Sequence, residues 1–378
     1  MKKPDKDERM TFASPTFGTR LERAAVTEPL PEAKPPKSKF RIWLKRGVFT
    51  LVALIIAGVL IFGWEFYSAA SKLTNQHNPF ALFTTILPRT PVETNGRVNI
   101  LLTGYSVGDP HHQGAALTDS IMIVSINPKT KQGNLISIPR DLWVHIPGNG
   151  YSKINAAYED GQAENFNQPG YFSGGLGLLQ KVISSDFGVH FNYYALINYA
   201  AVRDGVNAVG GINITINSPD PRGIYDPYTH LKLPNGTVHL DGQQALDLSR
   251  TRGDGPGSYG IPNADFTRTQ YQQEMLVALK RKAGKISSIF NPLTVLRLVN
   301  AVGNNVQTNL KIGEMESLYG DVKGINSSNI KTVTLNDYNG KDLLSNYYVE
   351  GQDALIPAAG FNDYSAIKNA VNNILYGS

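Results

Sequence analysis

The chain of 378 residues is long enough for one large domain or two smaller ones, and its 41% hydrophobic and 18% charged content is ordinary for a protein with a packed core. It contains no cysteine, which excludes a disulfide framework, a thiolate metal site and a cysteine nucleophile. Residues 1–46 hold 12 of the 36 basic and 6 of the 31 acidic residues, so the remainder holds 24 and 25, and the net charge of +5 belongs to the N-terminus. This distribution argues against a nucleic-acid-binding domain, which would carry its basic surface on the folded part.

Residues 47–64 form an uninterrupted run without a charged side chain, long enough for the hydrocarbon core of a bilayer. Basic residues precede the run and few charges follow it, so the positive-inside rule places the N-terminus in the cytoplasm. The run is not followed by the pattern of small residues that is typical of a signal-peptide cleavage site. We therefore expect a disordered basic cytoplasmic tail over 1–46, an uncleaved transmembrane helix over 47–67, and a single-pass protein of the cell membrane whose C-terminal domain is extracytoplasmic.

After a Pro-punctuated stalk over residues 68–95, strand-like and helical runs alternate. The predicted strands are 98–103, 120–126, 134–138, 142–146, 193–198, 212–216 and 330–335. The predicted helices are 173–187, 200–209, 267–285 and 364–375. This alternation predicts an α/β domain with a central mixed sheet flanked by helices. We expect its core over residues 96–285, completed by residues 286–378, which carry no motif with an interpretable role.

Four polar motifs stand out against this scaffold. They are LTDS with Asp119, SIPRD with Arg140 and Asp141, LSRTR with Arg250 and Arg252, and DFTRTQYQQ with Asp265, Arg268 and Gln272. Taken singly, each also fits a solvated turn, an edge strand or an exposed helix face. The two arginines of LSRTR are two apart and would share one face of an extended segment, whereas Arg268 and Gln272 share a helix face.

Two such faces, if they converge, would make a fork-shaped electropositive site suited to diphosphate oxygens. Asp119 beside these anions has an evident use in holding Mg²⁺, which takes few protein carboxylates and completes its shell with phosphate oxygens and water. The residues thus point to an extracytoplasmic site for a diphosphate-bearing ligand.

A family resemblance rests on eight motifs in order, which cover about residues 96–285. They are NILLTGYS, LTDSIMIVSINP, ISIPRDLWVHIP, KINAAYEDG, GLGLLQKVI, VNAVGGINITI, LDGQQALDLSRTR and DFTRTQYQQ. The series resembles the LytR-CpsA-Psr family of cell-wall glycopolymer transferases. The resemblance implies a membrane-anchored α/β domain with a hydrophobic polyprenyl pocket. It also implies transfer of a glycan phosphate from polyprenyl pyrophosphate to peptidoglycan, assisted by Mg²⁺ or Mn²⁺.

By position, Asp119 matches the family's metal-associated aspartate, which is also a candidate base for the acceptor hydroxyl. The resemblance implies catalytic roles for Asp119, Arg140, Arg250, Arg252, Arg268 and Gln272. Further candidates for substrate binding are Asp141, Lys153, Asn155 and Asp265. For Lys153 and Asn155, in KINAAY, a packing or supporting role fits as well as direct contact, and Asp141 is expected to orient a neighbouring arginine.

The chain departs from the family pattern in places that concern the metal and the site's charge. Gly104-Tyr105-Ser106 stands where the family often has Gly-x-Asp, and Asp109 could replace the missing carboxylate as a metal ligand. His111 and His112 are further candidates, although a solvated loop explains them as well. Leu117 and Tyr271 occupy two positions at which the family frequently has arginine. We therefore expect a less basic site than is usual for the family.

Two other functions remain open from the sequence. A polyprenyl-pyrophosphate pyrophosphatase would use the same site with water in place of a glycan hydroxyl. The domain could also be a non-catalytic glycan- or lipid-binding module or a membrane-bound regulator. The presence of Asp119 among four arginines speaks against a purely lipid-binding role, because a lipid site has no evident need for a carboxylate among phosphates.

Overall fold

The computed structural model describes residues 90–105, 117–285, 303, 305–336 and 338–377, which all belong to one of the chain's two compact units. The elements in chain order are β1 (Val98–Tyr105), β2 (Thr118–Asn127), β3 (Gln132–Ile138), β4 (Trp143–Ile146), β5 (Gly150–Lys153), α3 (Ala156–Ala163), α4 (Gly175–Phe187), β6 (Tyr193–Ile197), α5 (Tyr199–Ala208), β7 (Ile212–Ile216), β8 (Ile224–Asp226), β9 (Leu231–Leu233), β10 (Gly236–Leu240), α6 (Gly242–Arg250), α7 (Ala264–Lys285), β11 (Val306–Thr308), α9 (Ile312–Lys323), β12 (Ile330–Thr334), β13 (Leu344–Val349), β14 (Gln352–Pro357) and α10 (Ser365–Tyr376).

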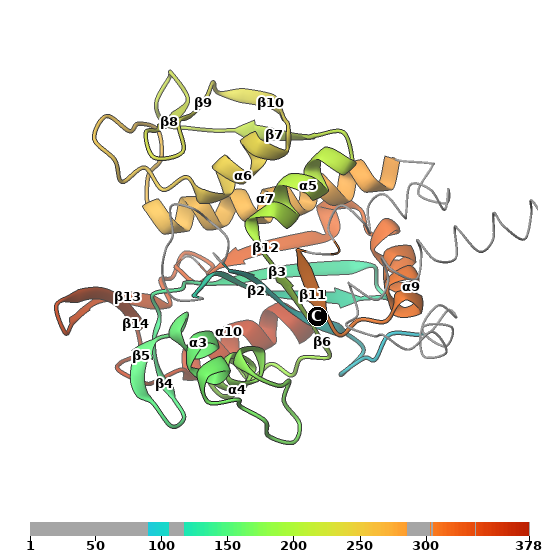
Figure 1. Ribbon diagram of the computed structural model, residues 1–378, viewed down its shortest axis with the longest axis vertical. Helices are drawn as coiled ribbons and strands as arrows, with labels where there is room; N and C mark the ends of the chain where they lie inside the picture. The colour runs from blue at the N-terminus through green and yellow to red at the C-terminus, as the bar shows by residue number, and fades with distance from the viewer. Residues whose placement is uncertain (1–89, 106–116, 286–302, 304, 337, 378) are drawn as a thin grey trace, which may run out of the picture. The chain divides into compact units, whose positions relative to one another are not determined.

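The central sheet has six strands in the order β11-β6-β1-β2-β3-β12 (Figure 1). β1, β2 and β3 form an antiparallel meander, whereas β6 joins β1 and β12 joins β3 in parallel. The predicted mixed sheet flanked by helices is confirmed. Both edge strands, β11 and β12, come from the part of the chain beyond residue 286.

Helices cover both faces of this sheet, which explains why its central strands read as nearly continuous apolar runs. On one face, the side chains of Leu101, Ile123 and Ile136 pack against α4 and α10 in the main core. On the other face, α9 packs against Val98 and Ile100. The sheet is therefore a rigid, two-sided support for whatever lies at its ends.

A second core lies outside the sheet, formed by α5, α6 and α7 with the short strands β7 to β10. Helix α6 begins with a capping box in which the Asp241 carboxylate accepts from the Gln244 backbone N–H, and the Gln244 side chain accepts from the Asp241 backbone N–H. The expectation that LSRTR is an extended segment is wrong for Arg250, which ends α6. The D-x-x-Q spacing of the capping box is the signal in the sequence that marks the start of this helix.

The expected tail over 1–46, transmembrane helix over 47–67 and most of the stalk over 68–95 lie outside the described residues. Among the helices that the structure does describe, none combines the length and apolar character that a bilayer crossing requires.

Candidate active site

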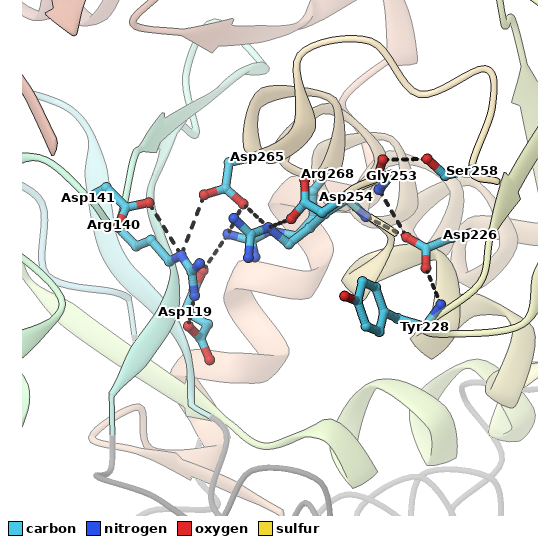
Figure 2. A network of polar contacts seen from close by, with 11 residues as sticks. Asp119, Arg140, Asp141, Asp226, Tyr228, Gly253, Asp254, Ser258, Asp265 and Arg268 are labelled. Atoms are coloured by element: carbon cyan, nitrogen blue, oxygen red, sulfur yellow. Dashed lines mark hydrogen bonds and ion pairs between the residues drawn. The ribbon is translucent and has the colours of Figure 1, made fainter. Parts of the chain in front are cut away.

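Polar side chains of five separate segments meet at one end of the central sheet. Asp119 lies at the start of β2, Arg140 and Asp141 lie in the turn after β3, and Lys153 ends β5. Helix α7 contributes Asp265, Arg268 and Gln272 from its first turns, and Arg252 follows α6. Figure 2 shows Asp119, Arg140, Asp141, Asp265 and Arg268 turned toward one another.

Asp119 reaches this cluster because β2 contains a bulge. Gly104 pairs with Ser120 and Tyr105 pairs with Thr118, so Asp119 has no partner on β1. A bulge breaks the alternation of a strand and re-aims the extra side chain, and bulges are frequent beside active sites. The register shift therefore directs the Asp119 carboxylate out of the sheet toward Arg140.

Arg140 is the first centre of the ion-pair network. Its Nη1 lies 2.5 Å from Oδ1 of Asp119, and its Nε lies 3.5 Å from a carboxylate oxygen of Asp141 and of Asp265. Burial works to lower the pKa of Arg140, but Asp265, Asp119 and Asp141 together raise it above its usual value. Asp141 also forms an ion pair with Lys153, whose Nζ lies 2.8 Å from its Oδ1, so Asp141 supports two cations at once.

Asp265 is the second centre, because its Oδ1 lies 2.7 Å from Nε of Arg252 and 3.2 Å from Nη2 of Arg268. Burial works to raise the pKa of Asp265, but Arg268, Arg140 and Arg252 hold it below its usual value. Burial lowers the pKa of Arg268, whose Nη2 also donates to the backbone carbonyl of Asp119 at 3.2 Å. A buried guanidinium is tolerated here because carboxylate and carbonyl oxygens surround it.

Some arginine side chains of the described cluster lie close to carboxylates and still have an N–H group without a hydrogen bond. Within the described residues, the buried Nε–H groups of Arg140, Arg252 and Arg268 have no aligned acceptor, although carboxylates lie nearby. Buried polar groups in proteins are nearly always hydrogen-bonded. Three guanidinium donors in one cluster therefore favour an anionic ligand with several oxygens.

The charges of the cluster balance. The ion pairs link four cations, Arg140, Lys153, Arg252 and Arg268, with four carboxylates, Asp119, Asp141, Asp254 and Asp265. A diphosphate bound here would bring negative charge in excess, and a divalent cation would offset it. Such a cation would have to take most of its ligands from phosphate oxygens and water.

Gln272 holds three elements together at the edge of the cluster. Its Oε1 accepts from the Ser120 hydroxyl at 2.8 Å, and its Nε2 donates to the Ser249 carbonyl at 2.9 Å. Gln272 therefore ties α7 to β2 and α6. Asn155, at the start of α3, contributes its backbone, because its N–H donates to the Arg140 carbonyl at 3.3 Å.

Arg250 does not join Arg252 as the sequence spacing suggested. Its guanidinium lies over the ring of Tyr199, 4.8 Å from the ring centre. Because Arg250 ends a helix and Arg252 follows the extended residue Thr251, the two side chains lie in different surroundings. Both still border the same large cavity.

Asp226 is a functional candidate that the sequence analysis missed. Its Oδ1 accepts from the backbone N–H groups of Tyr228 and Thr229, and its Oδ2 accepts from those of Arg252 and Gly253, at 2.8 to 3.2 Å. Burial works to raise the pKa of Asp226, but these four hydrogen bonds hold it below its usual value. Asp226 therefore fixes the loop that carries Arg252 (Figure 2). The Asp-Pro pair before Tyr228, typical of turns, was its only signal in the sequence.

A cavity of about 1300 Å³ opens from the charged cluster. Asp119, Arg140, Arg252 and Arg268 border it at the cluster. Apolar side chains from β1, β2, β6, α6, α7 and β11 line much of the rest, among them Leu102, Met122, Ile197, Leu246, Met275, Leu276, Leu279 and Val306. The cavity exceeds the usual range for a drug-sized ligand, so it can hold a long apolar chain with its polar head at the cluster.

The candidate ligands from the loop after β1, namely Asp109, His111 and His112, lie outside the described residues. Among the residues that are described, no group of three or more histidine or acidic side chains is arranged to hold a metal ion. Tyr271, at a position where arginine was considered, is buried in the second core and lies away from the charged cluster.

Comparison with known proteins relates the chain to one family. A model of the LytR_cpsA_psr family matches residues 60–358. A polyisoprenyl-teichoic acid–peptidoglycan teichoic acid transferase, TagU, of Enterococcus faecalis is 28% identical over 276 residues, covering 72% of this chain and 80% of that protein.

Two solved structures share the fold. One is described as TagT bound to LIIa-WTA, with a TM-score of 0.56, 24% identity and coverage of 76% of this chain and 94% of that chain. The other is described as YwtF (TagT) with bound octaprenyl pyrophosphate lipid, with a TM-score of 0.52, 22% identity and coverage of 76% and 94%.

Proposed function

The chain belongs to the LytR-CpsA-Psr family, and we propose that it is a membrane-anchored phosphotransferase that moves a glycopolymer from a polyprenyl pyrophosphate carrier to peptidoglycan. One observation carries the proposal. The arginine and aspartate cluster is continuous with a large cavity that has an extensive apolar lining, which suits a diphosphate attached to a long apolar chain. The relatives named as teichoic acid transferases support the same reaction class.

In the proposed reaction, an acceptor hydroxyl of peptidoglycan attacks the phosphorus that carries the glycan. The bond between this phosphorus and the bridging oxygen breaks, and polyprenyl monophosphate leaves. Arg140, Arg252 and Arg268 offer guanidinium donors to the charge that develops on the diphosphate. No covalent enzyme intermediate is required, because positioning and charge neutralisation account for most of the catalysis in such transfers.

Asp119 has two candidate roles, as the residue that holds Mg²⁺ and as the base for the acceptor hydroxyl. It borders both the cluster and the cavity, and its Oδ1 is held by Arg140. When bound, Mg²⁺ would neutralise part of the diphosphate charge. Asp109 stays a candidate second ligand on sequence grounds alone. We also propose that residues 47–67 anchor the enzyme, with its folded domain outside the cytoplasm.

The test uses the full chain in detergent, a polyprenyl pyrophosphate-linked glycan as donor, and peptidoglycan oligomers as acceptor. We expect glycan to become attached to peptidoglycan, with transfer lost in EDTA and restored by Mg²⁺ or Mn²⁺, because the balanced cluster cannot offset a diphosphate alone. Release of free glycan phosphate at the same rate without acceptor would indicate a pyrophosphatase. Full transfer in EDTA would contradict the role of the metal.

A further inference from the structure

Four aromatic side chains form a continuous group beside the cluster, which we term the aromatic platform: His145, Tyr151 and Phe361, which are exposed, and Tyr347, which is half-buried. The rings of His145 and Tyr151 lie 5.2 Å apart, those of Tyr151 and Phe361 5.1 Å, and those of Tyr347 and Phe361 5.9 Å. These residues come from the β4–β5 hairpin, the β13–β14 hairpin and the loop before α10. The platform thus joins the β4–β5 hairpin to a segment near the C-terminal end of the chain.

The platform is unusual for its exposure. Tyr151 and Phe361 are 42% and 48% exposed. The described residues include few other large apolar side chains that are this accessible, and one of them, Tyr348, lies on the same β13–β14 hairpin. A cluster of exposed aromatic side chains on a soluble surface commonly marks a binding site.

The first connection to the charged cluster runs along the β4–β5 hairpin. His145 pairs with Tyr151, and Trp143 pairs with Lys153. Side chains two residues apart on a strand share one face, so Tyr151 and Lys153 lie on the same face of β5, about 7 Å apart along the strand. Lys153 forms an ion pair with Asp141, which also pairs with Arg140.

The second connection runs through β14. The Leu355 backbone N–H donates to the Asp141 carbonyl at 3.0 Å, and the Leu355 side chain borders a small pocket together with Asp119 and Arg140. Leu355 pairs with Asn346, the residue before Tyr347. Both hairpins therefore lead directly from the cluster to the platform, and Figure 1 shows both of them on the same side of the molecule as the start of α7.

The platform and the cavity lie on different elements around the same cluster. The four platform residues are absent from the cavity lining, which comes mainly from β1, β2, α5, α6 and α7. Arg140 borders the cavity. The neighbouring Asp141 contacts both hairpins of the platform, through Lys153 of β5 and the backbone N–H of Leu355 in β14. If the lipid of the donor fills the cavity, the acceptor can still reach the diphosphate from the side of the platform.

We propose that the aromatic platform binds the saccharide backbone of the acceptor glycan strand, and so delivers its hydroxyl to the diphosphate. The inference rests on the proposed transferase function. The apolar C–H faces of sugar rings stack on aromatic rings, and tyrosine and histidine also hydrogen-bond sugar hydroxyls through their polar ends. A purely hydrophobic partner would favour aliphatic side chains, and these do not make up the platform.

The test is binding of soluble glycan strands released from peptidoglycan to the full chain, without any lipid donor. We expect Tyr151→Ala and Phe361→Ala each to raise the dissociation constant roughly tenfold, because each removes one stacking ring. Tyr348→Ala is the matched control. Tyr348 is 70% exposed and follows Tyr347 on the β13–β14 hairpin, but its ring does not contact the platform. Tyr151→Trp keeps a stacking surface and should retain binding.

The transfer assay separates this inference from the proposed function. We expect the KM for the acceptor to rise in Tyr151→Ala and Phe361→Ala while the KM for the donor is unchanged. Glycan binding at the platform without any transfer would overturn the transferase function and leave the binding site standing. Transfer with an unchanged acceptor KM in both variants, or a wild-type chain that binds no glycan strand, would overturn the platform.

Discussion

At the scale of single residues, the site depends on carboxylates that hold arginines in place. Asp119, Asp141 and Asp265 surround Arg140, and Asp265 also holds Arg252 and Arg268. Each guanidinium is thereby oriented before a ligand binds, and oriented donors cost no reorganisation during the reaction. The ion pairs of the cluster link equal numbers of cations and carboxylates.

Replacement of Arg140 tests this arrangement. We expect Arg140→Ala to lower the initial rate of transfer by about 10² to 10³, by analogy with the loss of one donor to transition-state charge. Arg140→Lys should recover only part of the rate, since an ammonium keeps the charge but lacks the planar fork. Arg222→Ala, at an exposed arginine outside the cluster, serves as the control. Thermal unfolding of each variant separates lost catalysis from lost folding, and an unimpaired Arg140→Ala enzyme would contradict the site.

At the scale of elements, irregularities place the functional groups more than regular structure does. The bulge in β2 turns Asp119 toward Arg140. The end of α6 separates Arg250 from Arg252, and the buried Asp226 fixes the loop between them and α7. The packing of α4 against β4 and α10 leaves Asp186 half-buried, and its buried Oδ2 has no hydrogen-bond partner among the described residues.

We expect Asp186 to make the stability of the fold depend on pH. Burial raises its pKa to about 6, against the opposing effects of Ser185, Lys368 and His145, and Tyr364 also lies nearby. Between pH 4 and 6 the folded chain therefore binds more protons than the unfolded chain, so stability falls as pH rises through this window. The shift corresponds to at most about 3 kcal/mol.

We expect Asp186→Asn to raise the free energy of unfolding at pH 7.5 by about 1 to 3 kcal/mol, because it removes a buried charge. The gain should disappear near pH 4, where the wild-type carboxyl is protonated. Denaturant unfolding at both pH values measures it. Asp353→Asn, at an exposed aspartate on β14, is the control. An equal gain at both pH values would show that burial of charge is not the cause.

At the scale of the whole domain, the cavity exists because the second core stands apart from the sheet. Side chains of β1 and β2 form one wall, and α5, α6 and α7 form the other. The charged cluster lies where α7 begins, so a ligand can place its head among the arginines and its apolar chain between the two layers (Figure 1).

Filling the cavity tests this arrangement. Leu276→Trp adds volume to the cavity wall, so we expect kcat/KM to fall about tenfold or more for donors with a long polyprenyl chain. Donors with a short chain should be affected little, because they need not reach this part. Gln270→Trp adds the same ring to an exposed position of α7 outside the cavity lining. Equal losses for long-chain and short-chain donors would argue against the cavity as the lipid site.

The sequence by itself determined the α/β class, the central strands, helix α7 and the placement of Arg140 and Asp141 at a strand end. These features are local, because alternation and helical periodicity report which side of an element is buried. The ordered motifs also led to the family. The pairing of Asp119 with Arg140 does not follow from them, because local pattern carries no information on distances between segments.

Only the tertiary structure decided the rest. The bulge at Asp119 depends on the register of two strands, the role of Asp226 depends on a loop 26 residues away, and the aromatic platform joins segments that meet only in the fold. The residues that line the cavity have the same apolar character as those of the core. A sequence cannot separate the two, because burial against a neighbour and burial around an empty volume impose the same pattern.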